Sequence, residues 1–536
     1  MGKNQAIFFI MNKGLTRREC LFLLAKVAGG SAAMMQAAKA LGIEQPTSTF
    51  QYKPLSKVSG KRPHVLILGA GVSALISAYE LTKAGYTCEI LEASHRVGGR
   101  NLTVRHGDLI DEIGNRQICD FDDQPNLYFN CGPARLPAHH HGIMHYCKEL
   151  NVPLQLFCNY NRNCYTQDDA SFGGEPLRIG DYETDIMGFT NEMIAKSMTS
   201  AGHLNSQVSE ADFERMLEYV KVQGDLNDAM KYHGSKRSGF ASGGIFTPGK
   251  LKTPRGFADL LKSNFWAGAM QFIHIADQAP AMMTPVGGMD SIIRHFLPHV
   301  QNMITLHAQV QKVELYDKGV EVSYAHNGKT KVAKGDYCLN SIPSQILSGI
   351  ENNFPAQYRK KMTMIQRGKL IKFGLQASER FWEKEDIYAG ISWTNQDISQ
   401  IWYPEHGTFA KKGVLLGGYS WIPEIVDRLA AMSPAARIEA VISQGERVHA
   451  NYRQYIEKGV SVCWHRMNHM LGCGTHWTPE IYDAAFATMQ APTGRHYLMG
   501  DQMALLPGWQ EGAVQSAWHA MLDIQQRESE LNRATV

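Results

Sequence analysis

Two glycines and an acid near the start of the chain have the types and spacing of a nucleotide-binding turn. Gly69 and Gly71 open a Gly-x-Gly-x-x-Ala string directly after an apolar run over 64–68, which is typical of a buried parallel strand. Gly69 permits the tight turn, and Gly71 lets the backbone approach a pyrophosphate. A second apolar run over 87–91 ends at Glu92, close to the ~20-residue offset of an acid that binds a ribose hydroxyl. An ordinary βαβ unit with glycine at its turn is the alternative, but the complete order favours a dinucleotide site.

The next segment indicates which nucleotide is bound. Residues 92–100 read Glu-Ala-Ser-His-Arg-Val-Gly-Gly-Arg. This string resembles the E-A-x-x-R-x-G-G-R segment of the flavin amine oxidases, in which the glycines and the last arginine approach the FAD pyrophosphate. Bare backbone N–H groups and a guanidinium both bind phosphate oxygens. The resemblance therefore implies FAD as the cofactor. Four further sequence blocks, at 132–137, around Lys372, around Tyr403 and at 501–513, resemble the L-amino-acid oxidase branch of this family.

Two of these blocks supply cations. Residues 132–137 read Gly-Pro-Ala-Arg-Leu-Pro and resemble a loop beside the flavin ring whose arginine grips the substrate carboxylate. Arg135 takes that position, and a planar guanidinium binds a carboxylate through two hydrogen bonds at any working pH. A structural arginine paired with an acid is the alternative. Lys372 is similar to a family lysine that holds a water at flavin N5, with Lys369 as a solvent-facing competitor.

Two later blocks supply aromatic and acidic groups. Tyr403, directly before a proline, is similar to a tyrosine that gives its hydroxyl to the substrate carboxylate, with a core aromatic as the alternative. Asp501 and residues 508–513 resemble the last flavin segment, in which the acid binds the ribityl chain and a helix N-terminus faces the ring. Trp509 would be one wall of an aromatic cage around the substrate amine.

The resemblance assigns roles to these residues together. Arg135, Lys372, Tyr403 and Trp509 are expected to be catalytic, and Arg135, Tyr403, Gly508 and Trp509 are expected to contact the substrate. The residues expected to contact FAD are Gly69, Gly71, Val72, Ser73, Glu92, Ala93, Arg100, Gly132, Pro133, Ala134, Arg135, Val310, Asp501, Gly508, Trp509, Gln510, Glu511, Gly512 and Ala513.

The elements that must position these residues predict a mixed α/β fold. Alternating strand and helix patterns favour a discontinuous Rossmann-like FAD-binding domain, beside a strand-rich substrate domain and an inserted helical lobe. The FAD-binding domain is expected at 61–100, 283–342 and 485–528, the substrate domain at 101–175 and 343–484, and the helical lobe at 176–282.

The N-terminus has the pattern of an export signal. Thr16-Arg17-Arg18-Glu19-Cys20-Leu21 and the short apolar run after it predict a twin-arginine signal peptide over 1–40. The run is too short and too interrupted for a stable membrane span. The pattern predicts a bacterial protein exported by the twin-arginine machinery to the periplasm or the medium. An N-terminal helix that stays on the enzyme is the alternative, and either Met1 or Met11 suits as the start.

Composition limits the other possibilities. A chain of 536 residues suits two or three lobes, and a net charge of +3 indicates no nucleic-acid partner. The ten cysteines show no metal-binding spacing. His139-His140-His141 looks like a metal tract, but it follows the 132–137 loop directly, so a surface or pocket-edge role is favoured and no metal is expected.

The resemblance implies a specific reaction. An L-amino acid would be oxidatively deaminated with dioxygen to a 2-oxo acid, ammonia and hydrogen peroxide, by hydride transfer from Cα to flavin N5. A flavin monoamine or polyamine oxidase and a flavin amino-acid 2-monooxygenase are the alternatives. The preferred side chain stays open, as do assembly into a homo-oligomer and covalent attachment of FAD at Cys473, a position similar to the attachment site in monoamine oxidases.

Overall fold

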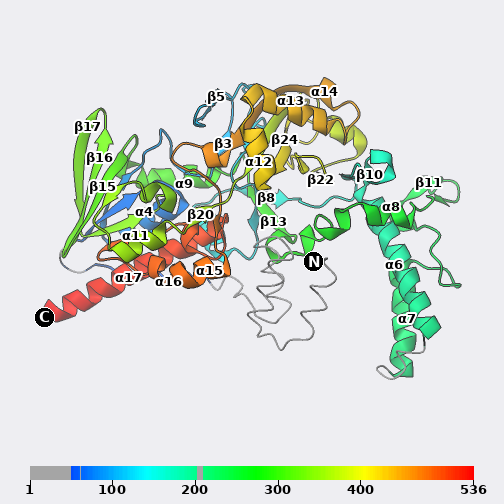
Figure 1. Cartoon of the computed structure of the whole chain (residues 1–536), viewed down its shortest axis with the longest axis horizontal. Coiled ribbons are helices and arrows are strands. Elements are labelled where there is room, and N and C mark those ends of the chain that lie inside the picture. The colour runs from blue at the N-terminus through cyan, green and yellow to red at the C-terminus, as the bar shows by residue number, and fades with distance from the viewer. Residues whose placement is uncertain (1–49, 59, 61, 202–208, 536) are drawn as a thin grey trace.

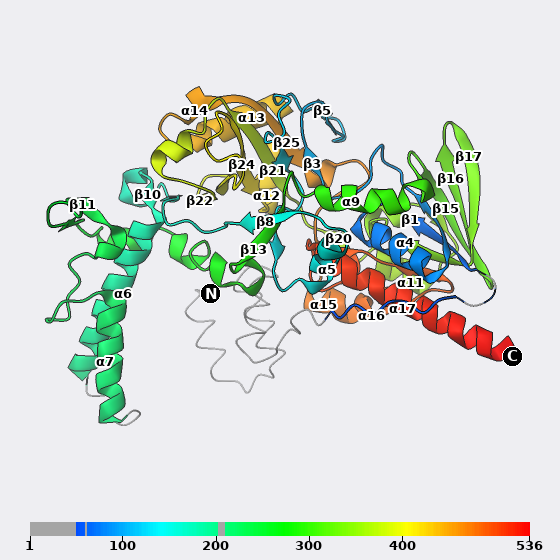
Figure 2. The same ribbon diagram turned by 180° about the vertical axis from the view of Figure 1, so that it is seen from behind.

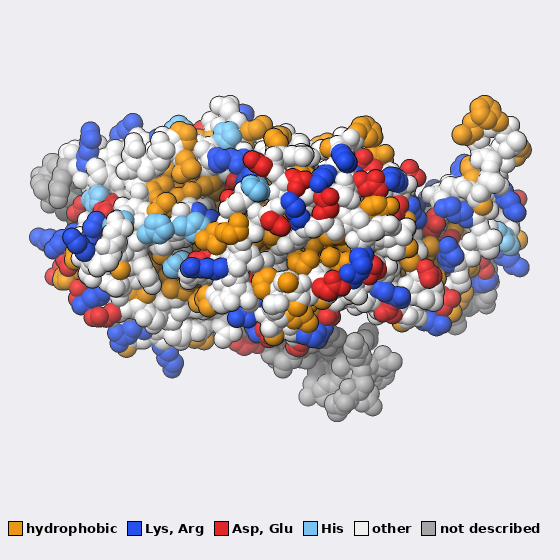
Figure 3. Space-filling view, turned by 90° about the horizontal axis from the view of Figure 1, so that it is seen from above, with side chains coloured by type: hydrophobic (Ala, Val, Ile, Leu, Met, Phe, Trp, Pro, Cys, Tyr) orange, Lys and Arg blue, Asp and Glu red, His pale blue; other side chains and the backbone are white. Residues whose placement is uncertain are grey.

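The computed structural model describes residues 50–58, 60, 62–201 and 209–535. The predicted signal peptide over 1–40 lies outside these residues. Among the helices of the described part, none has the length and apolar character needed to cross a bilayer. On the face shown in Figure 3, basic and acidic side chains are interspersed over most of the surface, with small apolar areas between them.

A five-stranded parallel sheet forms the half of the molecule that is predicted to bind the nucleotide, in the order β14-β2-β1-β18-β27. Its strands are β1 (His64–Leu68), β2 (Thr87–Leu91), β14 (Ile304–Thr305), β18 (Tyr337–Asn340) and β27 (His496–Leu498). The apolar side chains of β1 are fully buried, as expected for a strand covered on both faces. The sheet joins segments from three distant parts of the chain, which confirms the predicted discontinuous Rossmann-like fold.

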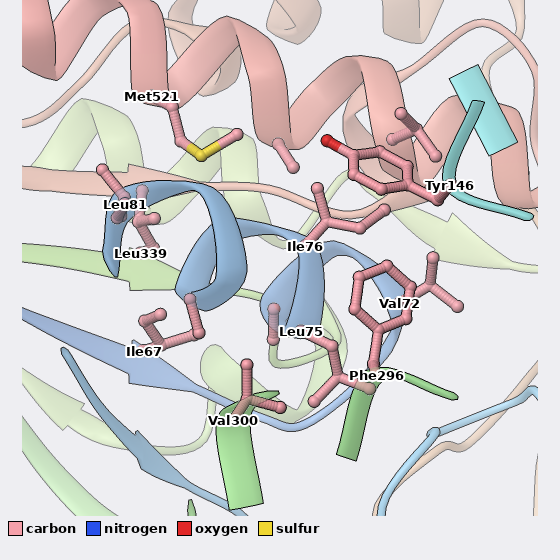
Figure 4. Packing of buried hydrophobic residues seen from close by; sticks show 14 of the residues in the cluster. Ile67, Val72, Leu75, Ile76, Leu81, Tyr146, Phe296, Val300, Leu339 and Met521 are labelled. Atoms are coloured by element: carbon pink, nitrogen blue, oxygen red, sulfur yellow. The ribbon is translucent and has the colours of Figure 1, made fainter. Parts of the chain in front are cut away.

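Helices cover this sheet around one apolar core. The first, α4 (Val72–Ala84), ends at Gly85, whose φ of 97° is the left-handed conformation that favours glycine. Figure 4 shows Ile76 of α4 between Tyr146 and Met521. The helices that pack around α4 are α5 (His141–Glu149), α9 (Ser291–Val300) and α17 (Gln510–Thr535). Each large apolar side chain fully buried here stabilises the fold by about 1.5–3 kcal/mol.

A mostly antiparallel sheet extends one end of the molecule (Figure 1). Its strands β15 (Gln309–Tyr316), β16 (Gly319–His326) and β17 (Lys329–Gly335) form a meander, and β19 (Glu351–Asn352) pairs with β15. Val313 and Val322 pair across it and are both buried.

A seven-stranded sheet forms the other half, in the order β10-β9-β22-β23-β24-β21-β25. The strands are β9 (Tyr165–Gln167), β10 (Leu177–Arg178), β21 (Ile371–Ala377), β22 (Gly390–Thr394), β23 (Gln400–Tyr403), β24 (Gly413–Ser420) and β25 (Ile456–Cys463). Helices α12 (Pro423–Ala430) and α13 (Pro434–Gly445) follow β24. Successive side chains face opposite sides of a strand, so Tyr403 packs in one core and Trp402 in another.

A helical lobe projects from this half. Its helices α6 (Ile179–Ala201) and α7 (Glu210–Gly224) lie side by side and point away from the rest of the molecule (Figures 1 and 2). A short hairpin of β11 (Phe240–Ser242) and β12 (Lys250–Leu251) and the helix α8 (Phe257–Lys262) follow. The chain leaves the lobe through β13 (Met282–Pro285), which pairs with β7 (Leu136–Pro137) and β8 (Leu154–Phe157). The exit of the lobe therefore lies directly beside the loop that carries Arg135.

A fully buried ion pair ties the loop after β4 (Leu109–Ile110) to the seven-stranded half. Arg437 of α13 donates to both carboxylate oxygens of Glu112, at 2.9 and 2.6 Å, and neither side chain is exposed. Further Arg437 N–H groups reach the carbonyls of Leu429 and Ala430. The guanidinium is therefore stable here only while the acid balances its charge.

We expect Glu112→Ala to destabilise the fold by about 3–5 kcal/mol, because it leaves a buried guanidinium without its counter-ion. The melting temperature of the purified protein measures the loss. Arg116→Ala is the matched control, since Arg116 pairs with Asp111 through a side chain that is 70% exposed, and exposed pairs contribute little. Equal melting temperatures for the two variants would contradict the assignment.

Candidate active site

The turn after β1 places two glycines at the start of α4. Gly69 has a φ of 89°, and a Cβ there would lie 2.5 Å from Ser341 Oγ, so only glycine fits. Gly71 begins α4 without a side-chain cap, and a Cβ on it would meet nothing within 4 Å. The space beside Gly71, at the first turn that includes Val72 and Ser73, is therefore open, which suits phosphate binding at a helix N-terminus.

Glu92 holds this turn and the neighbouring strands together. Its carboxylate accepts from the Ala70 N–H at 2.6 Å and from the Ser94 N–H, just beyond Ala93, at 2.7 Å. The Ala308 N–H donates to the Glu92 carbonyl at 2.8 Å. Val310, two residues further on, is therefore brought to the same edge of the sheet as Glu92.

An ion pair joins the first and last parts of the nucleotide-binding half. Arg100 donates to both carboxylate oxygens of Asp501, at 2.8 Å for the Nη1 contact, and also to the Cys473 carbonyl at 3.1 Å. The Gly508 N–H donates to the same carboxylate at 2.9 Å. Burial raises the pKa of Asp501, but Arg100 outweighs it and the pKa falls to about 2. Two residues expected to contact FAD separately therefore pair with each other.

Buried polar atoms around this pair lack hydrogen-bond partners within the described protein. They are Asn101 Oδ1, Arg367 Nε and Gln510 Nε2. Burial, and next the nearby Arg100, lowers the pKa of Arg367 to about 9. A buried polar group without a partner is costly, so these atoms fit a polar ligand that satisfies them. Together with the open helix N-terminus, they fit a flavin nucleotide.

At the start of α17, the Glu511 side chain does not have the role that the sequence predicts. The Glu511 side chain accepts from the N–H groups of Gly142 and Ile143, and so caps α5. Its carboxylate is thus directed at the protein, and the predicted flavin contact is left to backbone groups. Gly512 packs against Leu506, where a Cβ would lie 2.8 Å from the carbonyl oxygen, and Ala513 is half-buried behind it.

The guanidinium of Arg135 lies in an aromatic surround. Its central carbon is 4.7 Å from the ring centre of Trp402, 5.5 Å from Trp509 and 5.7 Å from Phe272. Its Nε donates to Gln278 Oε1 at 3.0 Å, and Nη2 donates to the same oxygen. Burial lowers the pKa of Arg135 to about 10. No carboxylate of the described residues forms an ion pair with it, which disfavours the structural alternative.

A second cation lies close by on the seven-stranded sheet. Lys372 of β21 donates to the Gly132 carbonyl at 2.5 Å and lies 4.7 Å from the ring centre of Tyr419, its cross-strand neighbour on β24. Burial, and then Arg135, lowers the pKa of Lys372 to about 8. Pro133 and Ala134 connect the two cations through the loop. Lys369, the competing lysine, pairs at the surface with Asp427.

The expected convergence of Tyr403 with Arg135 is wrong. The Tyr403 hydroxyl bonds to Ser392 Oγ at 2.7 Å and to His449 Nε2 at 2.6 Å, inside the opposite core. The reason is strand alternation, which turns Trp402 toward Arg135 and Tyr403 away from it. Tyr419 is the phenol on the Arg135 side, and burial raises its pKa to about 12. The sequence analysis thus missed Trp402 and Tyr419, although two-residue periodicity could have identified Trp402.

Comparisons with known proteins agree with this geometry. The model of the flavin containing amine oxidoreductase family matches residues 72–521. The L-amino-acid oxidase of Notechis scutatus scutatus is 25% identical over 494 residues, which cover 88% of each chain. FAD is the flavin of this family, so the predicted cofactor is confirmed.

Two solved structures share the fold. Wild-type putrescine oxidase bound to putrescine matches with a TM-score of 0.58 at 18% identity, over 88% of this chain and 99% of that chain. Cyclohexylamine oxidase from Brevibacterium oxydans matches with a TM-score of 0.59 at 15% identity, over 87% and 99%. At such low identities these matches show a common fold and do not indicate which substrate this chain takes.

The lowered pKa of Lys372 predicts a pH-dependent stability. An unfolded lysine titrates near 10.4, so between pH 8 and 10.4 the unfolded chain binds more protons at this position than the folded one. Wild-type stability then rises with pH across that window, by about 3 kcal/mol in total. Lys372→Met removes this contribution.

The difference in melting temperature, Lys372→Met minus wild type, should therefore be largest below pH 8 and shrink by pH 10.5. Scanning calorimetry on both holoenzymes at pH 7, 9 and 10.5 measures it. Lys369→Met is the control, because the Lys369 side chain is 41% exposed and pairs with Asp427 at the surface. If the difference in melting temperature between Lys372→Met and wild type did not change with pH, the lowered pKa of Lys372 would be refuted.

Proposed function

Since this chain belongs to the flavin-containing amine oxidoreductase family, we propose that it is a FAD-dependent L-amino-acid oxidase. An L-amino acid loses two electrons and two protons to become an imino acid, and water converts the imino acid to a 2-oxo acid and ammonia. FAD, when bound, takes up the two electrons and passes them to dioxygen, which gives hydrogen peroxide. The L-amino-acid oxidase of Notechis scutatus scutatus supports this reading as a relative.

One observation carries the proposal. Arg135 lies beside the predicted flavin segment, surrounded by Trp402, Trp509 and Phe272. Among the described residues, its side chain has only the neutral Gln278 side chain as a hydrogen-bond partner. A guanidinium kept in such a place without a counter-ion suits an anionic ligand. The Gln278 oxygen already accepts two of its N–H groups, the same number that a bidentate carboxylate would take with its two oxygens. A simple amine has no group for this position.

The surrounding side chains orient the substrate. With the carboxylate held at Arg135, the aromatic rings of Trp402 and Trp509 exclude water around the reacting carbon. The Tyr419 ring lies within electrostatic range of both Arg135 and Lys372, so its phenol is placed to add a third donor to the carboxylate. Such orientation can supply several kcal/mol of barrier reduction. Near its pKa of about 8, Lys372 can hold or release a proton at Nζ.

The carboxylate clamp can be tested directly. Arg135→Lys keeps the charge but loses the planar fork, so kcat/KM for amino acids should fall at least about tenfold, or ~1.4 kcal/mol. Amines without a carboxylate should lose far less, and FAD content should stay near normal. A peroxide assay over a panel of amino acids and amines measures both. Equal loss on both classes would favour an amine oxidase.

Two tyrosines make a matched comparison in the same assay. Tyr419→Phe should raise KM for amino acids, because Tyr419 faces Lys372 and Arg135. Tyr403→Phe should leave that KM nearly unchanged and lower the melting temperature instead, since its hydroxyl bonds only to Ser392 and His449 among the described residues. A raised KM for Tyr403→Phe together with an unchanged KM for Tyr419→Phe would instead indicate that Tyr403 contacts the substrate.

We also propose that the protein is exported by the twin-arginine route with FAD already bound. The support is the Thr16-Arg17-Arg18 pattern, in residues outside the described part of the chain. Replacing Arg17 and Arg18 by Lys should retain FAD-loaded enzyme in the cytoplasm, as cell fractionation and flavin absorbance would show. Normal export of this double variant would overturn the signal assignment.

A further inference from the structure

Three potential metal ligands from two lobes meet beside the candidate active site. His139 and His140 lie directly before α5, and Asp277 belongs to the short 3-10 turn over Ala276–Gln278. The Nε2 atoms of His139 and His140 are 2.8 and 3.0 Å from the same oxygen, Asp277 Oδ1. The three ligand atoms all lie within 4.8 Å of one another. Residues 138 positions apart in sequence thus form one compact cluster.

We propose that His139, His140 and Asp277 bind a divalent transition-metal ion of the zinc class. Two imidazoles and one carboxylate are a ligand set that suits Zn²⁺, Cu²⁺ or Ni²⁺ and disfavours Mg²⁺ and Ca²⁺, which prefer oxygen. Ligand atoms about 2 Å from a tetrahedral ion are about 3.3 Å apart, so these side chains need only small shifts to admit one. Each neutral imidazole would offer its Nε2 lone pair and keep its proton on Nδ1.

The surroundings combine rigidity with access. The His140 side chain is 2% exposed, and its ring stands perpendicular to that of Trp509 at 5.1 Å. The His139 side chain is 36% exposed, which leaves a path for the ion and for water as its remaining ligand. His141, the third member of the histidine run, is exposed and lies outside the cluster. The run by itself is therefore not the site, because the third ligand comes from Asp277.

The ion would fasten one segment over the substrate position. Asp277 is followed by Gln278, whose side chain binds Arg135 and whose carbonyl accepts from Asn159 at 2.5 Å. A metal ion on Asp277 would hold Gln278 against Arg135, so that an incoming carboxylate must compete with a fixed partner. This consequence rests on the proposed function, whereas metal binding itself does not.

Metal binding is tested on untagged holoenzyme stripped with a chelator. Titration calorimetry with Zn²⁺ should show one ion per chain, and Cu²⁺ bound instead should show two coordinated imidazole nitrogens by electron paramagnetic resonance. Asp277→Asn and His139→Asn should each weaken Zn²⁺ binding by at least about tenfold, given that even outer-sphere partners are worth 10–100-fold. His141→Asn should bind as the wild type does.

The result that overturns the site is Zn²⁺ binding that survives Asp277→Asn or that is lost in His141→Asn, because either would place the ion on the exposed histidine run. Absence of binding to the wild type would also overturn it. Flavin absorbance and melting temperature of each variant show whether it has folded.

Turnover then tests the link to Gln278. Saturating Zn²⁺ should raise KM for amino acids in the wild type, a chelator should reverse this, and Asp277→Asn should not respond. A bound ion without any change in KM would refute the fastening of the segment. An enzyme that binds Zn²⁺ but oxidises no amino acid would instead refute the proposed function.

Discussion

The ion pair between Arg100 and Asp501 closes a half-molecule that the chain builds in separate pieces. The βαβ unit ends at Arg100, and some four hundred residues later the chain returns through β27 and presents Asp501. Burial alone would favour a neutral Asp501, yet its pKa is about 2 because the guanidinium reaches both oxygens. The pair therefore fixes the last segment against the first, and the start of α17 is held beside the turn of α4.

Charge balance dominates the other half of the site. Arg135 and Lys372 are both drawn into an apolar surround, and burial lowers the pKa of each, with Arg135 further lowering that of Lys372. Two neighbouring cations, one buried and one half-buried, are unfavourable unless an anion joins them. Neutral carbonyl oxygens of Gln278 and Gly132 now offset part of that cost. A substrate carboxylate would replace the neutral Gln278 oxygen with a charged partner for Arg135. The affinity for the substrate would therefore depend on its negative charge.

The sequence was informative where chemistry and local geometry coincide. The turn at Gly69 and Gly71 could be predicted because its strand, helix and acid are contiguous, and the parallel sheet followed from the same pattern. Arg135 and Lys372 could be placed by resemblance, whereas Tyr403 was assigned to the wrong side. A one-residue shift along a strand reverses the face, and spacing to a following proline does not determine which residue points inward.

Other features depend on contacts that no local pattern records. Glu511 resembled a flavin residue by position, but its carboxylate caps α5, a helix more than 350 residues earlier. Asp277 and Gln278 lie in one short 3-10 turn at the exit of the helical lobe, where no periodicity indicates a site. They reach Arg135 and the two histidines only because β13 pairs with β7, directly after Arg135.

That pairing gives the helical lobe a physical connection to the candidate site. The strand β13 fixes where the lobe rejoins the body. The residues just before it bring Phe272 and Gln278 to the Arg135 guanidinium and Asp277 to the two histidines. Phe272 also packs on Trp393 of the seven-stranded sheet, at 5.2 Å between ring centres. The segment over 272–278 is thus held from both sides, by a strand pair and by an aromatic contact. Under the proposed function, a carboxylate that reaches Arg135 would have to displace the Gln278 oxygen, and the exit of the lobe would then help to select the substrate.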